Sequence, residues 1–442
     1  MEIKAYSYPD GEIQRVQITR PESWAQLEFY RPAPSPEALE RFGDIYRRYL
    51  VPACPWLFGN MVMFRLPEDF SGSLPMDTPW GRVADPVIAA AAMLRKGVTL
   101  RGEKPVFRNA AAKMLWETLE KQDCIRIVRG KLPITQIIPV GNLCGYLTEG
   151  EEAKLKVNAS FFIMDKFDCA TIYDQIGTPL GLQVKDGAVE NPPLFCREAL
   201  LVKKDGTVSV MPVSLQEMEI RGILYRVGEN ARIYSRPERS HTPMARGKKL
   251  VIIGNQVAAV SEMLSVPIPA SGFVLQVDPA CPAQPGDAVT YRGFEDIAFG
   301  IQVGNSILRQ GEKTEKFLSR FYNIYHLEPV PFPPSLYPMD FHKARAARIA
   351  LGANGDGSPV ILWAEGAAKI GHVPGQDSRG ATLRDMAQFC ADAGMVNAVN
   401  LDGGGSAQLL TDGLRSLMLS DRDPQTGAQV ERPIPLALTV RK

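Results

Sequence analysis

The chain has 442 residues, 45% of them hydrophobic and 22% charged, and a formal net charge of +1. This near-neutral balance gives no sign of a nucleic-acid scaffold, and the length favours two domains or one elaborated domain. No apolar run approaches the roughly 20 residues of a membrane helix, and no apolar signal core begins the chain, so we expect a cytoplasmic protein.

Residues 1–122 have a character of their own, with proline-rich joints at Arg31–Pro36 and Pro52–Pro55. Apolar residues at helical spacing predict helices over Pro36–Leu50 and Arg108–Lys121. Because this part contains no chemical motif, we expect a mixed or helical accessory domain that could also serve as a homo-oligomer interface.

From about Asp123 the pattern changes to strands joined by tight turns, which predicts a second domain over residues 123–442. Because hairpins outnumber long crossovers there, we expect a mostly antiparallel sheet. Turn residues between apolar runs predict hairpins at Lys185–Gly187, Lys203–Gly206, Gly254–Asn255 and Asn354–Gly357.

One amphipathic helix interrupts the strands, with Leu383 and Met386 on its apolar face. Thr382 and Asp385 fit a capping box at its start, and Gly394 is placed to end it. The predicted fold class is therefore α+β, with a mostly antiparallel, hairpin-rich sheet and a few packed helices beside the N-terminal domain.

The clearest functional signal is Asn397–Ser406, a short strand that leads into three glycines. Side chains alternate across a strand, so Asn400 and Asp402 should project on the same face. Successive N–H groups of a glycine turn can converge on an anion, and a carboxylate beside such a cradle suits a phosphoester or glycosyl site. The alternative is a tight turn that ends a buried strand.

The common nucleotide-binding motifs do not fit this glycine run. A P-loop needs a lysine after its last glycine, but Ala407 follows Ser406. Both the dinucleotide fingerprint and the nucleophile elbow need a glycine at the position of Gln408. The four histidines show no HExxH pattern or close pairing, and the seven cysteines no CxxC, so a zinc site is not expected.

The block Asn400–Ser406, NLDGGGS, together with the helix before it, resembles the signature of the phosphodiester glycosidase family. Further blocks are similar in order, namely VNASFF at Val157–Phe162, GTPLGLQVKDG at Gly177–Gly187, RIALG at Arg348–Gly352 and the closing ERPIPLALTV. The resemblance implies a catalytic domain over 123–442 that hydrolyses the sugar–phosphate linkage of a sugar-1-phosphodiester, in a small molecule or a polymeric phosphoglycan.

A phosphate monoester is already a good leaving group, so such a reaction depends less on a general acid than on a carboxylate near the anomeric carbon. We expect Asp402 to be that carboxylate and Glu365 the second, since Glu365 ends a strand whose hairpin partner begins at Arg348. The planar fork of Arg348 suits a phosphate. A cross-strand ion pair between Arg348 and Glu365 is the alternative.

The remaining expected contacts are to substrate. Asn158 would bind a sugar hydroxyl or, alternatively, satisfy buried backbone groups. No cofactor is expected to be required; Asp165 and Asp168 could bind a divalent cation, although a polar loop explains them equally. A non-catalytic carbohydrate- or phosphoglycan-binding protein on the same fold is the competing function. The full set of expected substrate-binding residues is Arg348, Asn158, Asn400, Gly403, Gly404, Gly405 and Ser406.

Overall fold

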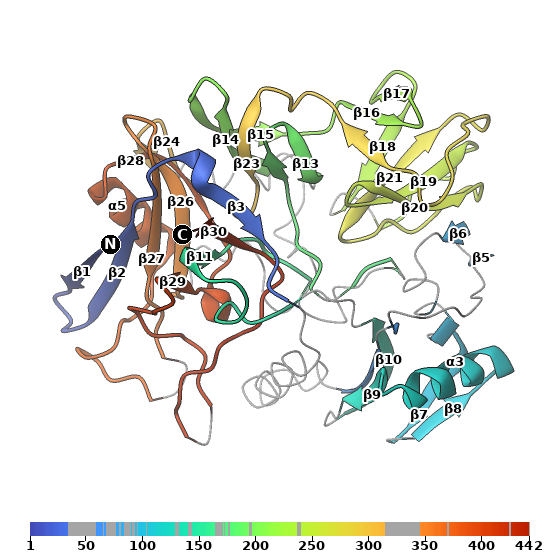
Figure 1. Cartoon of the computed structure of the whole chain (residues 1–442), viewed down its shortest axis with the longest axis horizontal. Coiled ribbons are helices and arrows are strands. Elements are labelled where there is room, and N and C mark those ends of the chain that lie inside the picture. The colour runs from blue at the N-terminus through green and yellow to red at the C-terminus, as the bar shows by residue number, and fades with distance from the viewer. Residues whose placement is uncertain are drawn as a thin grey trace.

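The computed structural model shows a β-rich molecule (Figure 1). None of its described helices is long and apolar enough to cross a membrane. The described residues are 1–33, 59–64, 66–67, 77–78, 81–83, 90, 93–94, 96–102, 104–128, 132–139, 144–163, 171, 173–175, 177–193, 197–236, 240–313, 345–368, 371–423 and 426–441.

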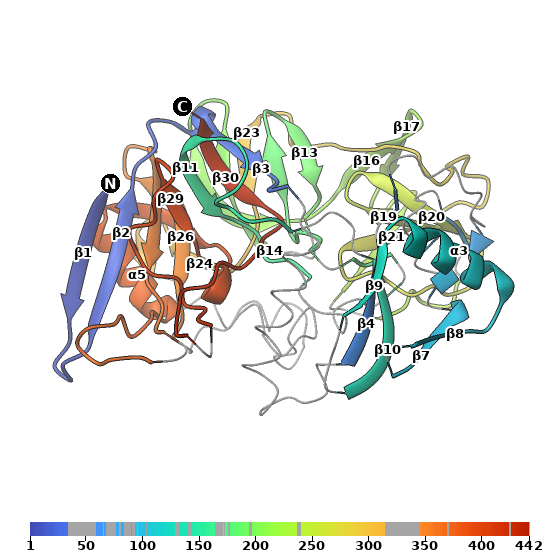
Figure 2. The same cartoon turned by 60° about the horizontal axis from the view of Figure 1, so that its bottom comes forward.

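The glycine-rich turn follows a strand of a seven-stranded sheet, seen at the left of Figures 1 and 2. Every pairing in this sheet is antiparallel. From one edge to the other it contains β1 (Glu2–Ser7), β2 (Ile13–Thr19), β27 (Pro359–Ala364), β26 (Arg348–Asn354), β28 (Met395–Asn400), β24 (Ser306–Arg309) and β25 (Glu312–Lys313).

The two central strands β26 and β27 are buried on both faces, because their sequences RIALGAN and PVILWA are almost wholly apolar. Leu351 and Trp363 point into the main core, whereas Ala350 and Leu362 pack under helix α5 (Leu383–Asp392). Side chains on both faces of the sheet therefore hold β26 and β27 in place, and the glycine turn follows β28, the strand next to β26.

The main core lies between this sheet and two smaller antiparallel sheets, and the short η1 (Trp24–Gln26) packs into it. The first contains β29 (Leu409–Thr411), β11 (Ala153–Asn158), β30 (Ala437–Arg441) and β3 (Leu27–Tyr30). The second contains β13 (Ala188–Asn191), β12 (Gln183–Lys185), β23 (Ile297–Ile301), β14 (Arg197–Lys203) and β15 (Val208–Val213).

A further group of strands lies at the upper right of Figure 1, and its core includes side chains from the five-stranded sheet. One sheet contains β17 (Ile223–Arg226), β16 (Glu217–Ile220) and β22 (Val289–Tyr291). The other contains β18 (Arg232–Ser235), β21 (Gly272–Val277), β19 (Lys248–Ile253), β20 (Gln256–Ser261), β6 (Gly81–Val83) and β5 (Asp77–Thr78).

A small unit at the lower right of Figure 1 has a separate core, into which helix α3 (Ala110–Lys121) packs Leu115, Trp116 and Leu119. Its β10 and β4 pair in parallel, unlike the antiparallel pairs of the other sheets. The strands are β10 (Leu132–Pro139), β4 (Gly59–Phe64) and β9 (Ile125–Val128) in one sheet, and β7 (Val98–Arg101) and β8 (Lys104–Phe107) in another.

The mostly antiparallel, hairpin-rich character is confirmed, and all four predicted hairpins are present. They are β12–β13, β14–β15, β19–β20 and β26–β27. Their turns contain the predicted glycines, which take positive φ where the chain reverses, for example +86° at Gly206.

Both predicted helices that fall on described residues are also present. α5 begins at a complete capping box between Thr382 and Asp385, and Gly394 follows it with φ +84°. α3 begins after Asn109, whose side chain accepts from the N–H of Ala112. The predicted helix Pro36–Leu50 lies outside the described residues, so a helical N-terminal domain stays a prediction.

The first thirty residues belong to the sheets of the C-terminal part. β2 pairs with β27, and β3 pairs with β30. Ala33 lies directly against Gly145, since a Cβ on that glycine would be 1.9 Å from the carbonyl oxygen of Ala33. The two ends of the segment 34–143 therefore lie close together, although β6 within it pairs with β20. The division at residue 122 stays a prediction.

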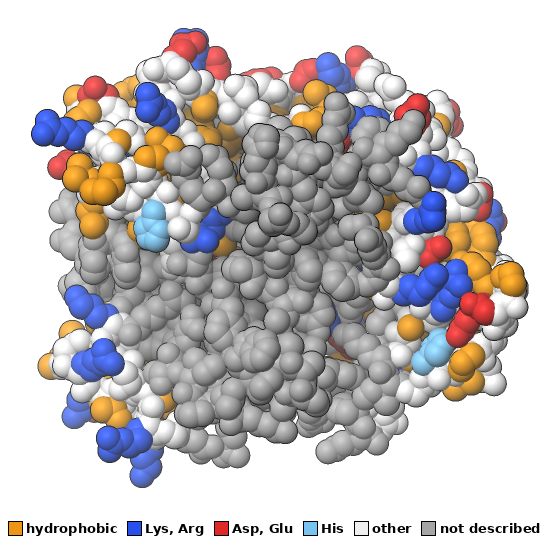
Figure 3. Space-filling model, turned by 180° about the vertical axis from the view of Figure 1, so that it is seen from behind, with side chains coloured by type: hydrophobic (Ala, Val, Ile, Leu, Met, Phe, Trp, Pro, Cys, Tyr) orange, Lys and Arg blue, Asp and Glu red, His pale blue; other side chains and the backbone are white. Residues whose placement is uncertain are grey.

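The face seen from behind carries Lys and Arg side chains scattered over its described rim, with Asp and Glu among them (Figure 3). This mixture agrees with the net charge of +1. A basic stripe of the kind that tracks nucleic acid is not seen on the described part of this face.

Replacing 34–143 with a short Gly-Ser linker should leave a cooperatively unfolding protein, because the two ends of this segment lie close together. A chain that begins at residue 123 should lose cooperative unfolding, since it lacks β2 and β3. Thermal unfolding followed by circular dichroism compares the two with the full chain. A cooperative 123–442 fragment with an unchanged melting temperature would contradict this account.

Candidate active site

Asp402 and Arg348 face each other across two neighbouring strands. Ala350 on β26 pairs with Asn400 on β28, and the Leu401 N–H donates to the Ile349 carbonyl at 2.8 Å. Continuing this register places Arg348 opposite Asp402, on the face that carries Asn400. Sheet register thus brings together two residues 54 positions apart in the sequence (402 − 348).

The Asp402 carboxyl is buried, with 8% of the residue exposed. Its Oδ1 accepts from the Gly403 N–H at 2.8 Å. Burial raises the pKa of Asp402 to about 6, against the lowering effects of a Ser406 hydrogen bond, Arg432, the Gly403 N–H and Arg348. Such a carboxyl exchanges protons near neutral pH, which is typical of catalytic carboxyls.

Two buried guanidinium groups act on this carboxyl. Arg348 is 5% exposed and donates from Nε to the Ala381 carbonyl at 3.3 Å. Burial lowers its pKa to about 10, and the charge of Asp402 opposes that shift. Arg432 is equally buried and donates from Nε and Nη2 to Asp421 Oδ2, at 3.0 and 2.8 Å.

Sequence reasoning missed both Arg432 and Asp421. Arg432 stands in the block ERPIPLALTV, which carried part of the family resemblance, so a signal for it existed. Asp421 lies in an irregular segment, and only the tertiary structure places it against Arg432.

The glycine turn, which includes the short η4 (Gly404–Ser406), differs from the predicted anion cradle. The N–H of Gly403 is bound to Asp402, and the N–H of Gly404 donates to the Ala347 carbonyl at 2.8 Å. Two of the three expected phosphate donors are therefore used within the chain.

Each of the three positions requires a glycine for its own steric reason. A Cβ on Gly403 would lie 2.6 Å from the Ala347 carbonyl oxygen, and Gly404 has φ +61° with open space beside it. A Cβ on Gly405 would lie 2.2 Å from both Arg432 Nη2 and Asp421 Oδ2. The run therefore lets the backbone approach β26 and the ion pair closely.

Glu365 is not brought to Asp402. Since Arg348 pairs with Ala364, the next residue along projects to the opposite face. Its carboxylate accepts from Arg15 Nη1 at 3.0 Å, from the Ser378 hydroxyl and from the Met418 N–H. The expected second carboxylate thus lies in a different set of contacts, and its ion-pair partner is Arg15 rather than Arg348.

Asn158 holds the turn in place. Its Nδ2 donates to the Asp402 carbonyl at 2.8 Å, and its Oδ1 accepts from the Gln408 N–H at 2.9 Å. This is the backbone-satisfying role that we considered as the alternative, and the sugar contact stays a prediction. Two buried polar atoms, Ser160 Oγ two residues after Asn158 and Asn400 Oδ1 two residues before Asp402, have no protein partner among the described residues. Unpaired buried atoms of this kind often meet a water or a ligand.

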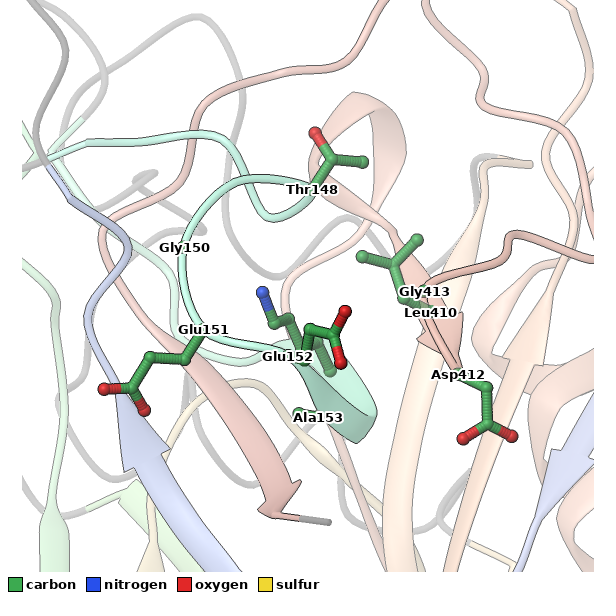
Figure 4. A pocket seen from close by; sticks show the side chains of 9 residues that line it. Thr148, Gly150, Glu151, Glu152, Ala153, Leu410, Asp412 and Gly413 are labelled. Atoms are coloured by element: carbon green, nitrogen blue, oxygen red, sulfur yellow. The ribbon is translucent and has the colours of Figure 1, made fainter.

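A cavity of about 230 Å³ lies at the far end of β11 (Figure 4). The carboxylates of Glu151 and Asp412 point apart in Figure 4. The ammonium of Lys156 is bound to the carbonyl oxygens of Leu147 and Glu149 at 3.2 and 3.0 Å. The cavity contains none of the expected site residues, and its lysine is tied to the surrounding loop.

No group of three or more His, Cys, Asp or Glu side chains suited to a metal ion occurs within the described ranges. The two aspartates proposed for a cation, Asp165 and Asp168, lie outside those ranges.

Comparison with known proteins matches residues 278–441 to the family model described as phosphodiester glycosidase. The resemblance to this family is confirmed. The matched range contains Arg348, Asp402, Asp421 and Arg432. The match gives general support to a phosphodiester glycosidase-like function and leaves the substrate open.

Two curated relatives are the mouse and bovine N-acetylglucosamine-1-phosphodiester alpha-N-acetylglucosaminidases. The mouse protein is 35% identical over 81 residues, 18% of this chain and 14% of its own length. The bovine protein is 40% identical over 77 residues, 17% of this chain and 13% of its own length. The similarity to these curated relatives therefore spans a small part of their length.

Two solved structures show distant similarity at 16% identity. The zebrafish N-acetylglucosamine-1-phosphodiester alpha-N-acetylglucosaminidase catalytic domain aligns with a TM-score of 0.32, over 67% of this chain and 68% of that one. A hypothetical protein from Synechocystis aligns with a TM-score of 0.41, over 99% of this chain and 61% of that one.

Gly405→Ala should destabilise the protein by about 1–3 kcal/mol, because the new methyl group would overlap the Asp421–Arg432 ion pair. The matched control is Gly355→Ala, where the nearest atom to the new methyl would be 4.0 Å away. Its effect should stay within about 0.5 kcal/mol. Urea unfolding measures both, and equal losses would show that the ion pair does not constrain the turn.

Proposed function

We propose that this protein hydrolyses the sugar–phosphate bond of a sugar-1-phosphodiester. The observation that carries the proposal is the buried Asp402 carboxyl with Arg348 opposite it and Arg432 nearby, inside the range that matches the family. In this reaction the anomeric C–O bond breaks, water supplies a hydroxyl to the sugar, and a phosphate monoester leaves.

Asp402 is the group that acts on the anomeric carbon. With a pKa of about 6 it is mostly ionised at pH 7, so it can stabilise positive charge on the sugar, attack it, or take a proton from water. Its buried position keeps bulk water away, which strengthens its electrostatic effect on the reacting sugar.

Arg348 is the group that holds the phosphate. Its planar guanidinium can bind two phosphate oxygens at once, and its burial makes that interaction stronger than at the surface. The Gly405 N–H and the unpaired Asn400 Oδ1 are further contacts, to phosphate and to a sugar hydroxyl respectively. The phosphate is thus held mainly by a side chain rather than by a glycine cradle.

The choice of substrate class is supported by the names of the relatives, which specify N-acetylglucosamine-1-phosphodiesters. We propose a substrate of the same class, either small or part of a phosphoglycan. The competing function is binding of such a glycan without hydrolysis. Asp402 favours the enzyme, because a negative charge beside a bound phosphodiester weakens binding, whereas hydrolysis needs a carboxylate near the anomeric carbon.

The test is release of free sugar from a panel of sugar-1-phosphodiesters that includes N-acetylglucosamine-1-phosphodiesters. Asp402→Asn should lower the rate by about 10²–10⁴-fold while the fold is retained, because it removes the reactive carboxylate. Asp412→Asn changes a carboxylate on the loop after β29 and should leave the rate unchanged. Near-normal turnover by Asp402→Asn would remove Asp402 from the mechanism. Release by no panel member, from folded protein, would favour the binding function.

A further inference from the structure

Three short segments lie beside the end of β28 and are joined to it and to one another by the backbone. The segments are 159–161, 180–182 and 302–304, and the end of the strand is 400–402. Four N–H···O=C bonds of 2.8 to 3.0 Å connect them, from Asp402 to Ala159, from Leu180 to Phe161, from Gln302 to Leu182 and from Gly304 to Asn400. These bonds form a closed circuit that includes Asp402.

One side of this circuit is apolar and the other is polar. The side chains that point into the main core are Ala159, Phe161, Leu180, Val303 and Leu401. Because side chains alternate along an extended chain, the residues between them project the other way. On that side lie Ser160, Gln302, Gly304, Asn400 and Asp402. Asp402 thus belongs to a face made of polar residues and a glycine.

Two side chains on this polar face have atoms without a protein partner. Ser160 is 3% exposed and Asn400 is 1% exposed, and neither Ser160 Oγ nor Asn400 Oδ1 is hydrogen-bonded within the described part of the chain. Ser406, the serine of the glycine turn, differs, since its oxygen accepts from Arg432 Nη1 at 3.4 Å. Unpaired buried polar atoms cost free energy, and a ligand that supplies their partners removes that cost.

We propose that Ser160 and Asn400 form the sugar subsite and select a sugar that has a hydrogen-bond donor next to its anomeric carbon. This donor is a hydroxyl or an amide N–H. The Asn400 oxygen accepts from it, and the Ser160 hydroxyl donates to the oxygen of the same substituent. The inference rests on the function proposed above, because that function places the anomeric carbon at Asp402.

The backbone hydrogen bonds separate the sugar side of Asp402 from the phosphate side. Along one edge the end of β28 donates to Ile349 of β26, and along the other edge Asp402 donates to Ala159. Arg348 precedes Ile349 and Ser160 follows Ala159, so the two lie on opposite sides of Asp402. A phosphodiester whose phosphate is bound by Arg348 and whose anomeric carbon is at Asp402 therefore extends its sugar toward Ser160.

The spacing along β28 suits one sugar ring. Asn400 and Asp402 are two residues apart on the same face, so their Cβ atoms are about 6.5–7 Å apart. The Asn400 amide nitrogen lies against Gly304, where a Cβ would be 2.8 Å from it. With the anomeric carbon at Asp402, the substituent on the adjacent ring carbon is the group within reach of the Asn400 amide.

The first measurement is the melting temperature of the ligand-free protein. Ser160→Ala should leave it unchanged or raise it, because the substitution removes a buried hydroxyl that has no protein partner. The matched control is Ser378→Ala. Ser378 is 1% exposed, and its hydroxyl accepts from the Arg15 N–H at 3.0 Å and donates to Glu365. The control should lower the melting temperature by roughly 1–3 °C. A loss at Ser160 as large as that of the control, or larger, would assign Ser160 a structural role and overturn the proposal.

The second measurement is ligand binding to Asp402→Asn, in which the proposed reaction is blocked and the ligand stays intact. Titration calorimetry compares the methyl 1-phosphodiesters of glucose, N-acetylglucosamine and 2-deoxyglucose, which differ at the carbon next to the anomeric one. The 2-deoxy ligand should bind at least about tenfold more weakly than the better of the other two, because it leaves Asn400 unpaired. Which of those two binds better shows whether the substituent is a hydroxyl or an amide.

Adding Ser160→Ala to Asp402→Asn completes a cycle between the serine and the sugar substituent. The preference over the 2-deoxy ligand should shrink to about threefold or less, while the affinity for the 2-deoxy ligand itself stays unchanged. Equal weakening of all three ligands would show that Ser160 supports the structure and would overturn the proposal. So would equal binding of the three ligands before the substitution, or no binding of any of them.

The binding data and the hydrolysis assay fail separately. If the preference is found but the wild type releases no sugar, the proposed reaction is wrong and the subsite stands. If the wild type releases sugar but the three ligands bind Asp402→Asn equally, the subsite is wrong and the reaction stands.

Discussion

The structure around the site depends on one electrostatic constraint, the burial of the Asp402 carboxylate opposite the Arg348 guanidinium. Buried charges are costly unless they are paired and hydrogen-bonded. The neighbouring residues meet that requirement: the Gly403 N–H donates to Asp402, and Asp421 compensates the charge of Arg432. Burial still raises the pKa of Asp402 above its ordinary value, which leaves a carboxyl suited to chemistry near neutral pH.

The residues that pair with and position Asp402 come from segments that are distant in sequence. β26 and β28 carry the pair, Asn158 at the end of β11 holds the turn, and the approach to β30 supplies Arg432. Strands from the first thirty residues close the edges of the same sheets. The site is therefore supported by strands of two sheets rather than by one motif.

Local features were predictable from the sequence because short-range chemistry decides them: the turn residues of four hairpins, and the capping box of α5. Asp402 and Arg348 could be named because the family resemblance singled out their blocks. The contacts that the sequence could not show are non-local. Glu365 pairs with Arg15, which is 350 residues away, and the ion pair that packs on Gly405 comes from the end of the chain. Nor can a sequence show which N–H groups of a glycine turn are already bound within the protein.

The central claim is that Arg348 is present to bind a phosphodiester beside the reactive carboxyl. The most direct test compares kcat/KM of wild type and Arg348→Ala on a sugar-1-phosphodiester and on a neutral aryl glycoside of the same sugar. The account predicts a loss at least about tenfold larger on the phosphodiester, because only that substrate offers oxygens to the guanidinium. Equal losses on both substrates would show that Arg348 supports the structure and does not recognise phosphate.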